Sequence, residues 1–284
     1  SRELILFQNI GYTHAEWAFR NRAGKWTQGK LPWPDGKDYP KAQPIRVCYP
    51  DVVLKNRAVY FCGVSDIVEP YPEWRAFKKQ LTGNEWDYDF RRLFFTWCPD
   101  ITTGKFQDWI EIASRDKTAG WISPGDLWVG PDSTVHIVWT ERALDERLRE
   151  KFFSEAKQSH SLNYAAVRDG KVLVRQTLLI AGAGKSNEYP SAPRFQATPD
   201  NRLFLIYYVH GSDAAGKRVS ENRVMEILSS GNTGEAVRVG FKSPFTSYFT
   251  ATVRAGSPPS ETLELLGQRE GAPQTMSYAR IKLR

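Results

Sequence analysis

The stretch FQATPDNRLFLIYYVHG at 195–211 decides the predicted fold. It reads as an apolar strand, a tight polar turn at Pro199-Asp200, and a second apolar strand that ends in aromatic residues. A sheet hairpin of this kind that recurs at long, unequal intervals is typical of β-propeller blades separated by loop insertions. It recurs as LWVGPDSTVHIVWTE at 127–141 and VVLKNRAVYFCGVSD at 52–66, and more loosely as TATVRAGSPPSETLELLGQ at 250–268.

Further strand candidates follow each hairpin, so a full unit reads as a four-stranded antiparallel sheet. We expect three strands in the first unit, four in each of the next three, and three in the last. The predicted fold is therefore an all-β, single-domain β-propeller over 1–284. About five blades are visible, at 1–40, 45–115, 121–181, 189–241 and 245–284. The incomplete terminal blades favour the later part of a larger propeller, with about six or seven blades and further strands before Ser1.

Insertions separate the second and third strands of several blades. One inserted helix is predicted near 141–156, where apolar residues fall on one face of the helical period. These residues are Leu144, Leu148, Phe152 and Phe153. The insertion at 65–90 occupies the equivalent place in the preceding blade. In it, NEWDYDFRR at 84–92 alternates aromatic and acidic residues, which predicts a strand with aromatics inward and charges outward.

Charge and composition narrow the choice of partner. The net charge of +7 and the sequence pI near 9.2 favour an anionic partner. Lys and Arg are scattered along the chain, which argues against nucleic acid, and no apolar run is long enough to span a membrane. We expect an acidic poly- or oligosaccharide as the partner; the alternative is a merely basic protein. We expect a secreted or periplasmic protein. No signal segment opens the sequence, so an exported protein would already have lost it.

Cysteines and short motifs give no sign of a metal or cofactor. The cysteines are Cys48, Cys62 and Cys98, an odd number without metal-ligand spacing, which favours small buried hydrophobes over a disulfide framework. A turn at Lys55-Asn56 would place Cys62 opposite Tyr49. The run AGAGKS at 181–186 lacks the spacing of a phosphate loop, and GxSxG, HExxH and CxxC do not occur. We therefore expect neither a metal nor a cofactor.

The loops between second and third strands share a face with the segments that lead into the inner strands, and a propeller builds its pocket on such a face. Nearly every unusual polar group of the chain falls there. The candidate catalytic residues are His160, His210, Tyr248 and Glu141. The candidate substrate-binding residues are His14, Arg46, Asp66, Trp74, Arg194 and Arg223.

These residue types suit acid–base chemistry on an acidic ligand. Imidazole exchanges protons near neutral pH, and the forked donors of arginine clamp a carboxylate. Each type also has a plainer alternative. A loop histidine is commonly a surface hydrogen-bonding group, an arginine commonly joins blades through salt bridges, and a carboxylate at a turn is commonly a surface group.

The run SRDKTAGW at 114–121 resembles the Asp-box of sialidase-like propellers, S-x-D-x-G-x-T-W. Ser114, Asp116 and Trp121 match that pattern, while other residues fill the Gly and Thr places. The segment 189–208 likewise resembles the inner hairpins of BNR-repeat propellers. That group includes sialidases, other glycoside hydrolases and polysaccharide lyases of uronate-rich glycans. Asp-boxes are structural turns, so this resemblance carries over no catalytic residue.

The resemblance implies a carbohydrate-active enzyme that cleaves an anionic or uronate-containing glycan, as a glycoside hydrolase or a polysaccharide lyase. A sialidase-type site needs three arginines and a tyrosine nucleophile, for which the three arginines above and Tyr248 are candidates. A lyase-type site needs a histidine or tyrosine base beside an arginine, which His160 or His210 with Arg194 would supply. The alternative is a non-catalytic glycan-binding or protein-interaction propeller, since fold alone does not give function.

Overall fold

The computed structural model describes residues 3–8, 10–228, 231–252, 254 and 256–283. The chain divides into two compact units, which are described separately. Unit 1 comprises 1–124 and 142–158, and unit 2 comprises 125–141 and 159–284.

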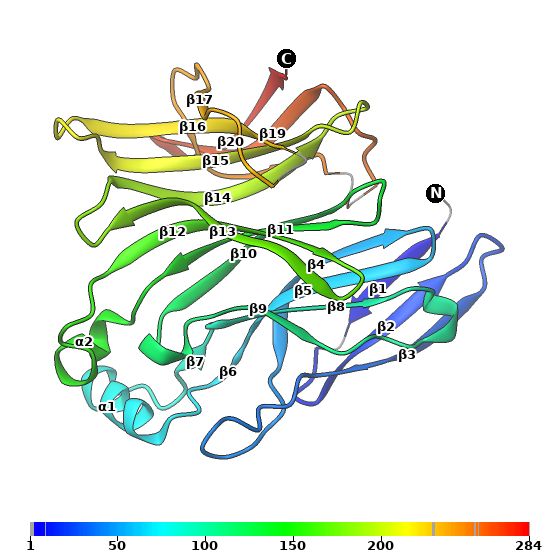
Figure 1. Ribbon diagram of the computed structural model, residues 1–284, viewed down its shortest axis with the longest axis horizontal. Helices are drawn as coiled ribbons and strands as arrows, with labels where there is room; N and C mark the ends of the chain where they lie inside the picture. The colour runs from blue at the N-terminus through cyan, green and yellow to red at the C-terminus, as the bar shows by residue number, and fades with distance from the viewer. Residues whose placement is uncertain (1–2, 9, 229–230, 253, 255, 284) are drawn as a thin grey trace. The chain divides into compact units, whose positions relative to one another are not determined.

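Unit 1 is built on two antiparallel meander sheets (Figure 1). The first consists of β1 (Leu4–Gln8), β2 (His14–Arg20) and β3 (Trp26–Pro32). The second consists of β4 (Val47–Lys55), β5 (Ala58–Ser65), β8 (Arg92–Cys98) and β9 (Ile110–Ser114). A ribbon of β6 (Ile67–Val68) and β7 (Tyr88–Asp89) lies between β5 and β8 in sequence. Short 3-10 turns, η1 (Ile101–Thr103) and η2 (Asp116–Thr118), precede and follow β9.

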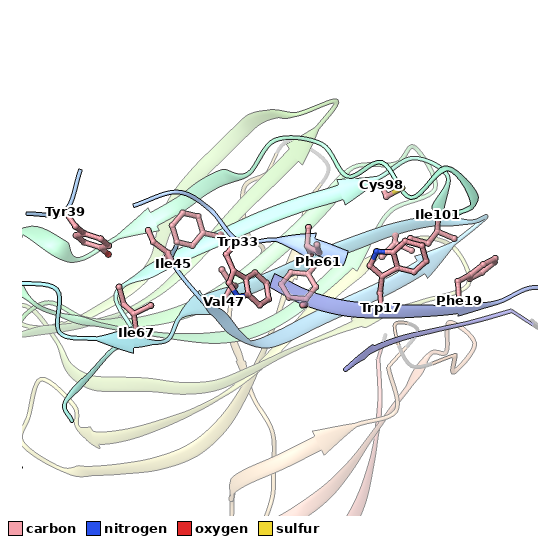
Figure 2. Packing of buried hydrophobic residues seen from close by; sticks show 14 residues of the cluster. Trp17, Phe19, Trp33, Tyr39, Ile45, Val47, Phe61, Ile67, Cys98 and Ile101 are labelled. Atoms are coloured by element: carbon pink, nitrogen blue, oxygen red, sulfur yellow. The ribbon is translucent and has the colours of Figure 1, made fainter. Parts of the chain in front are cut away.

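The core of unit 1 follows from the alternation along β2. Every second side chain of β2, at Ala15, Trp17 and Phe19, is buried, as expected for one buried face of a sheet. Figure 2 shows Trp17 and Phe19 in one apolar cluster with Phe61 of β5. Trp33 joins the cluster, and its indole Nε1 donates to the Gly11 carbonyl at 2.7 Å, so the polar end of this buried ring is satisfied.

The described residues contain two α-helices, α1 (Pro72–Thr82) and α2 (Glu146–Phe152), which pack against each other in unit 1 (Figure 1). The prediction of one inserted helix is therefore wrong in number. The predicted helix exists as α2 but is shorter than 141–156. The unpredicted α1 has proline at its N-terminus and is capped at its C-terminus by Gly83. Gly83 has a φ of 70°, a left-handed conformation that glycine adopts without the steric cost of a Cβ atom.

A buried cation joins the two helices. The Nζ atom of Lys78, in α1, lies 2.7 Å from Glu69, 2.7 Å from Asp87 and 3.5 Å from Asp145. Asp145 also caps α2, accepting from the Arg147 N–H at 3.0 Å. Each carboxylate comes from a different segment, so one ammonium group fixes the insertion and both helices together.

The segment 84–92 does not have its aromatics inward and its charges outward, as the alternation predicted. Trp86 is 62% exposed, whereas Asp89 is only 2% exposed. Asp89 is buried because Arg91 Nη2 donates to it at 2.6 Å and Ser65 Oγ at 2.9 Å. The buried guanidinium compensates the charge of the buried carboxylate.

The turn between β4 and β5 lies at Asn56 and Arg57, one residue later than predicted, and both residues have positive φ values of 51° and 67°. With this register Cys62 faces Asp51 and not Tyr49, so the predicted pairing is wrong. A bulge between Cys48 and Asp51 shifts the register once more. The described cysteines are all free thiols.

Unit 2 contains three sheets, again with strands in sequence order, except that the first four residues of β10 and the last residue of β11 belong to unit 1 (Figure 1). The first consists of β10 (Trp121–Val129), β11 (Val135–Arg142), β12 (Ser159–Arg168) and β13 (Lys171–Gly182). The second consists of β14 (Asn187–Ala197), β15 (Leu203–Ser212), β16 (Arg218–Ile227) and β17 (Val237–Arg238). The third consists of β18 (Phe245–Thr250), β19 (Thr262–Arg269) and β20 (Ala272–Lys282).

Strand β15 explains the apolar run LFLIYYV that marks the repeat. Leu205, Tyr207 and Val209 belong to one buried cluster, whereas Phe204 and Ile206 belong to another. The strand is therefore buried on both faces, and a strand buried on both faces has no polar alternation.

Sheets of three, four, four, four and three strands follow one another through the described part of the chain. The predicted all-β class and blade-type antiparallel sheets are therefore confirmed. A meander of up to four strands is the construction of a propeller blade. The single-domain organisation and the strands expected before Ser1 stay predictions.

Candidate functional site

One end of the strands in unit 2 brings together three of the polar rings on the predicted face. His160 lies at the start of β12, Tyr189 at the start of β14, and His210 near the end of β15. Antiparallel pairing places Tyr189 directly opposite His210. We call His160, Tyr189 and His210 the imidazole–phenol cluster.

The rings of the cluster are close enough to exchange protons with one bound molecule. The His160 and Tyr189 ring centroids are 5.1 Å apart and nearly perpendicular, and those of Tyr189 and His210 are 5.7 Å apart. His210 is exposed, and the other two rings are partly exposed. Tyr208 stacks on His210 from the same strand, at 5.7 Å. Solvent therefore reaches a phenol flanked by two imidazoles, which is a set of groups suited to acid–base catalysis.

Neighbouring residues position the His210 end of β15. The Tyr208 hydroxyl bonds to Ser220 Oγ at 2.9 Å, and Ser220 in turn donates to Glu270 at 3.0 Å. At Gly211, φ is 128° and an added Cβ would lie 1.9 Å from the Asn187 carbonyl. Only glycine permits this close approach, which sets Tyr189 of β14 beside His210.

Arg223 lies at the same end of the sheet, and two of its three nitrogens donate to carboxylates. Its Nη1 donates to Glu188 and its Nε to Glu221, both at 2.6 Å. Arg238 also approaches Glu221 at 3.1 Å. The arginine that was predicted to clamp a substrate carboxylate therefore lies between two glutamates of the protein itself. Sequence reasoning did not predict that Glu188 and Glu221 would pair with Arg223.

Arg194 and Tyr248 have structural surroundings. Arg194 Nη1 donates to the Gly125 carbonyl at 2.8 Å and to the Pro193 carbonyl at 2.7 Å. Tyr248 is 3% exposed, and burial raises the pKa of its hydroxyl well above the usual value, so it stays a neutral phenol at physiological pH. Glu141 is buried at the end of β11 and accepts from the Trp139 indole at 2.6 Å.

In unit 1 the structure brings Arg46 and Asp66 together. Arg46 Nη2 lies 3.0 Å from Asp66 Oδ2, and its Nε donates to the Asp66 carbonyl at 2.9 Å. The Tyr12 and Tyr88 rings lie 4.9 and 5.7 Å from the guanidinium. Burial, followed by the Asp66 carboxylate, raises the pKa of the Cys48 thiol to about 12, so this cysteine is no nucleophile at neutral pH.

Trp74 and His14 have other neighbours. Trp74 belongs to an aromatic cluster, with ring centroids 4.4 Å from Tyr71 and 5.4 Å from Phe153 of the segment after α2. His14 Nδ1 bonds to Thr13 Oγ1 at 2.8 Å. The structure thus pairs two of the four predicted residues of unit 1 and gives Trp74 a packing role.

Sequence reasoning missed a row of aromatic rings in unit 1. Phe90 lies 5.7 Å from Tyr49 and 4.5 Å from Trp121, and the Arg142 guanidinium lies 5.9 Å from Trp121. Tyr49 is 65% exposed and has a φ of 51° in the bulge of β4. We call Tyr49, Phe90 and Trp121 the aromatic row. A strained backbone conformation that exposes an aromatic ring is typical of a binding site, and exposed aromatic rings stack on the faces of sugars. The Tyr49-Pro50 pair, which interrupts the strand pattern, is the only sequence signal for it.

Within the described residues, no group of three or more His, Cys, Asp or Glu side chains is arranged to hold a metal ion. In the same part of the chain, neither α1 nor α2 has the length and apolar character needed to cross a membrane.

No protein-family model and no curated protein matches the sequence. Solved structures that are similar to the chain include an endo-arabinase from Bacteroides thetaiotaomicron, with 11% identity, a TM-score of 0.45, and coverage of 100% of this chain and 90% of that one. An α-L-arabinanase from Penicillium chrysogenum, complexed with arabinobiose, has 9% identity, a TM-score of 0.47 and coverage of 99% and 90%. A protein of unknown function from Dyadobacter fermentans has 8% identity, a TM-score of 0.50 and coverage of 99% and 79%.

These similarities are distant and concern the fold alone. Two of the similar structures are an endo-arabinase and an arabinanase. The resemblance to sialidase-like and BNR-repeat propellers stays a prediction.

Proposed function

We propose that this chain is a carbohydrate-active enzyme that cleaves a uronate-containing glycan by elimination at the imidazole–phenol cluster. The observation that carries the proposal is the convergence of His160, Tyr189 and His210 from three strands, with ring centroids 5.1 and 5.7 Å apart. The net charge of +7 supports an anionic substrate.

The chemistry assigns one role to each ring. His210, the exposed imidazole, removes the proton on the carbon next to the uronate carboxyl group. The electron pair of that C–H bond forms the new C=C bond as the glycosidic C–O bond breaks, and the Tyr189 hydroxyl protonates the departing oxygen. His160 donates an N–H to the substrate carboxylate. Arg194 and Arg223 suit this role less well, because each already bonds to carbonyl or carboxylate partners.

The test is incubation with polygalacturonate, alginate and hyaluronan, following both the ultraviolet absorbance of the unsaturated product and new reducing ends. Elimination raises both signals, whereas hydrolysis raises reducing ends alone. We expect His210→Gln and Tyr189→Phe each to lower kcat about 100-fold or more. Tyr278→Phe, an exposed tyrosine on β20, is the matched control and should leave activity unchanged.

New reducing ends without ultraviolet absorbance would reject elimination. The Glu188 and Glu221 carboxylates would then be the candidate groups for hydrolysis. Full activity in both His210→Gln and Tyr189→Phe would remove the cluster from the mechanism altogether.

The second candidate function is glycan binding without cleavage, which the aromatic row favours. Exposed rings at Tyr49 and Trp121 are suited to stacking on sugar rings. In this case an oligosaccharide binds without any product, and Tyr49→Ala or Trp121→Ala weakens binding about tenfold. Trp86→Ala, another exposed tryptophan of unit 1, serves as the control.

A further inference from the structure

A cavity of about 640 Å³ lies in unit 2, between the first and second of its sheets. The residues that line it lie near the hairpin turns of these sheets, and one of them is Leu203 at the start of β15. His210 is seven residues further along the same strand, or about 23 Å at the usual rise. The cavity is therefore separate from the imidazole–phenol cluster, and its size falls in the range of small-molecule sites.

The aromatic part of the lining carries a single polar pair. His136 Nδ1 and the Tyr164 hydroxyl are 2.7 Å apart, and the Trp128 ring centroid lies 5.0 Å from that of His136. Burial lowers the pKa of His136 to about 4, so the imidazole is neutral at physiological pH. Among the described residues its Nε2 has no hydrogen-bond partner. Whichever tautomer is present, Nε2 offers one hydrogen bond, as donor or acceptor.

The charged groups of the lining neutralise one another. Arg168 pairs with Asp132 and also donates to Thr134 Oγ1 at 2.9 Å. Arg202 forms a two-pronged pair with Glu226, at 2.9 and 2.8 Å. Two guanidinium groups therefore face two carboxylates, and the lining carries no net charge with which to select an ion.

The remaining lining is mostly apolar. Aliphatic side chains contribute to it from three strands, at Leu173, Val174, Leu203 and Ile227. A saccharide would leave several hydroxyl groups against this aliphatic surface, and each unpaired polar group is costly to bury. A flat apolar ring system would instead stack on Trp128 and fill the space.

We infer that this cavity binds an uncharged aromatic molecule of about two fused rings that carries one hydroxyl or N–H group. The ring system stacks on Trp128 and contacts the aliphatic side chains, while its polar group bonds to His136 Nε2. The inference is independent of the proposed function, because it concerns other residues at the opposite end of the strands.

The test uses 2-naphthol, whose fluorescence reports binding, and naphthalene-2-carboxylate, which has the same rings and a negative charge. We expect saturable binding of 2-naphthol and at least about tenfold weaker binding of the carboxylate. Leu173→Trp places a bulky ring in the cavity at an exposed position and should weaken naphthol binding about tenfold or more. Leu266→Trp, at an exposed leucine of β19, is the matched control.

Tyr164→Phe provides a second variant, because it removes the hydroxyl that fixes the orientation of the His136 ring. Nε2 is then no longer held in one position, so binding should also weaken. Absence of naphthol binding, equal binding of the carboxylate, or unchanged binding in both Leu173→Trp and Tyr164→Phe would each overturn the inference. Binding of methyl glucoside in place of naphthol would overturn the aromatic class.

Discussion

The surroundings of Asp116 disfavour the charged form of its carboxyl group. It is the aspartate of the Asp-box-like run, and it lies 3.5 Å from Arg91 Nε and 3.7 Å from Arg92 Nη1. Burial, followed by the charge of Asp89, raises the pKa of Asp116 to about 7, despite the two arginines. The folded state therefore holds a proton on this carboxyl that the unfolded chain, with its usual value of 3.8, releases.

This raised pKa predicts the effect of Asp116→Asn on stability. In the wild type, the protonated carboxyl contributes to the free energy of unfolding. This contribution is fully present below about pH 4 and is lost as pH rises to about 7. The asparagine variant has no proton to lose. We therefore expect its Tm relative to the wild type to rise steadily between about pH 4 and 7 and to level off above. A Tm difference that is independent of pH would contradict the assigned pKa.

At the scale of elements, Lys78 holds α1, α2 and the segment between them. Its ammonium group is the shared partner of Glu69, Asp87 and Asp145. Replacing it leaves these three carboxylates with only the guanidinium groups of Arg91 and Arg147 as cationic partners among the described residues. Losing one partner of a buried ion pair costs far more than losing a surface pair.

We therefore expect Lys78→Met to lower the free energy of unfolding by about 3 kcal/mol or more. Lys79→Met, at the next residue of the same helix, is the control. Lys79 is half exposed and pairs with Glu85 at 3.2 Å, so its loss should cost under about 1 kcal/mol. Denaturant unfolding of both variants measures the difference, and equal losses would show that the buried network adds nothing.

The elements that repeat were predictable, whereas those that deviate were not. Hairpins such as 195–211 carry their own apolar and turn signals, so the strands and their order could be predicted. Helix α1 was missed although Pro72 and Gly83 mark its ends, because the insertion was interpreted only as the counterpart of another loop. The bulge at Tyr49 depends on local backbone geometry that the pattern does not report.

For the candidate site, the pattern predicted which end of the strands would collect His160 and His210. It could not predict the partners of the arginines. Arg223 pairs with Glu188, which lies 35 residues away in the sequence. Such a pairing depends on how β14 and β16 are aligned in the folded sheet. Whether these histidines are catalytic stays a prediction.

At the scale of the whole molecule, the net charge of +7 provides a test of the proposed capture of an acidic glycan. Long-range attraction is screened within about 10 Å at 0.1 M salt and about 3 Å at 1 M. We expect KM for an acidic glycan to rise several-fold between about 0.05 and 0.5 M NaCl, with kcat nearly unchanged. A neutral arabinan serves as the comparison, and an equal salt effect on both would exclude recruitment by charge.

The path of the chain between the two units limits how this protein can be divided. Unit 1 is not continuous, because 142–158 belongs to it although unit 2 has already begun at 125. A gene fragment that ends at Pro124 would lack Asp145 and Arg147, and so would leave Lys78 and Asp87 short of partners. Shuffling or domain-exchange experiments should therefore transfer 142–158 together with the first 124 residues, for instance with a linker in place of 125–141.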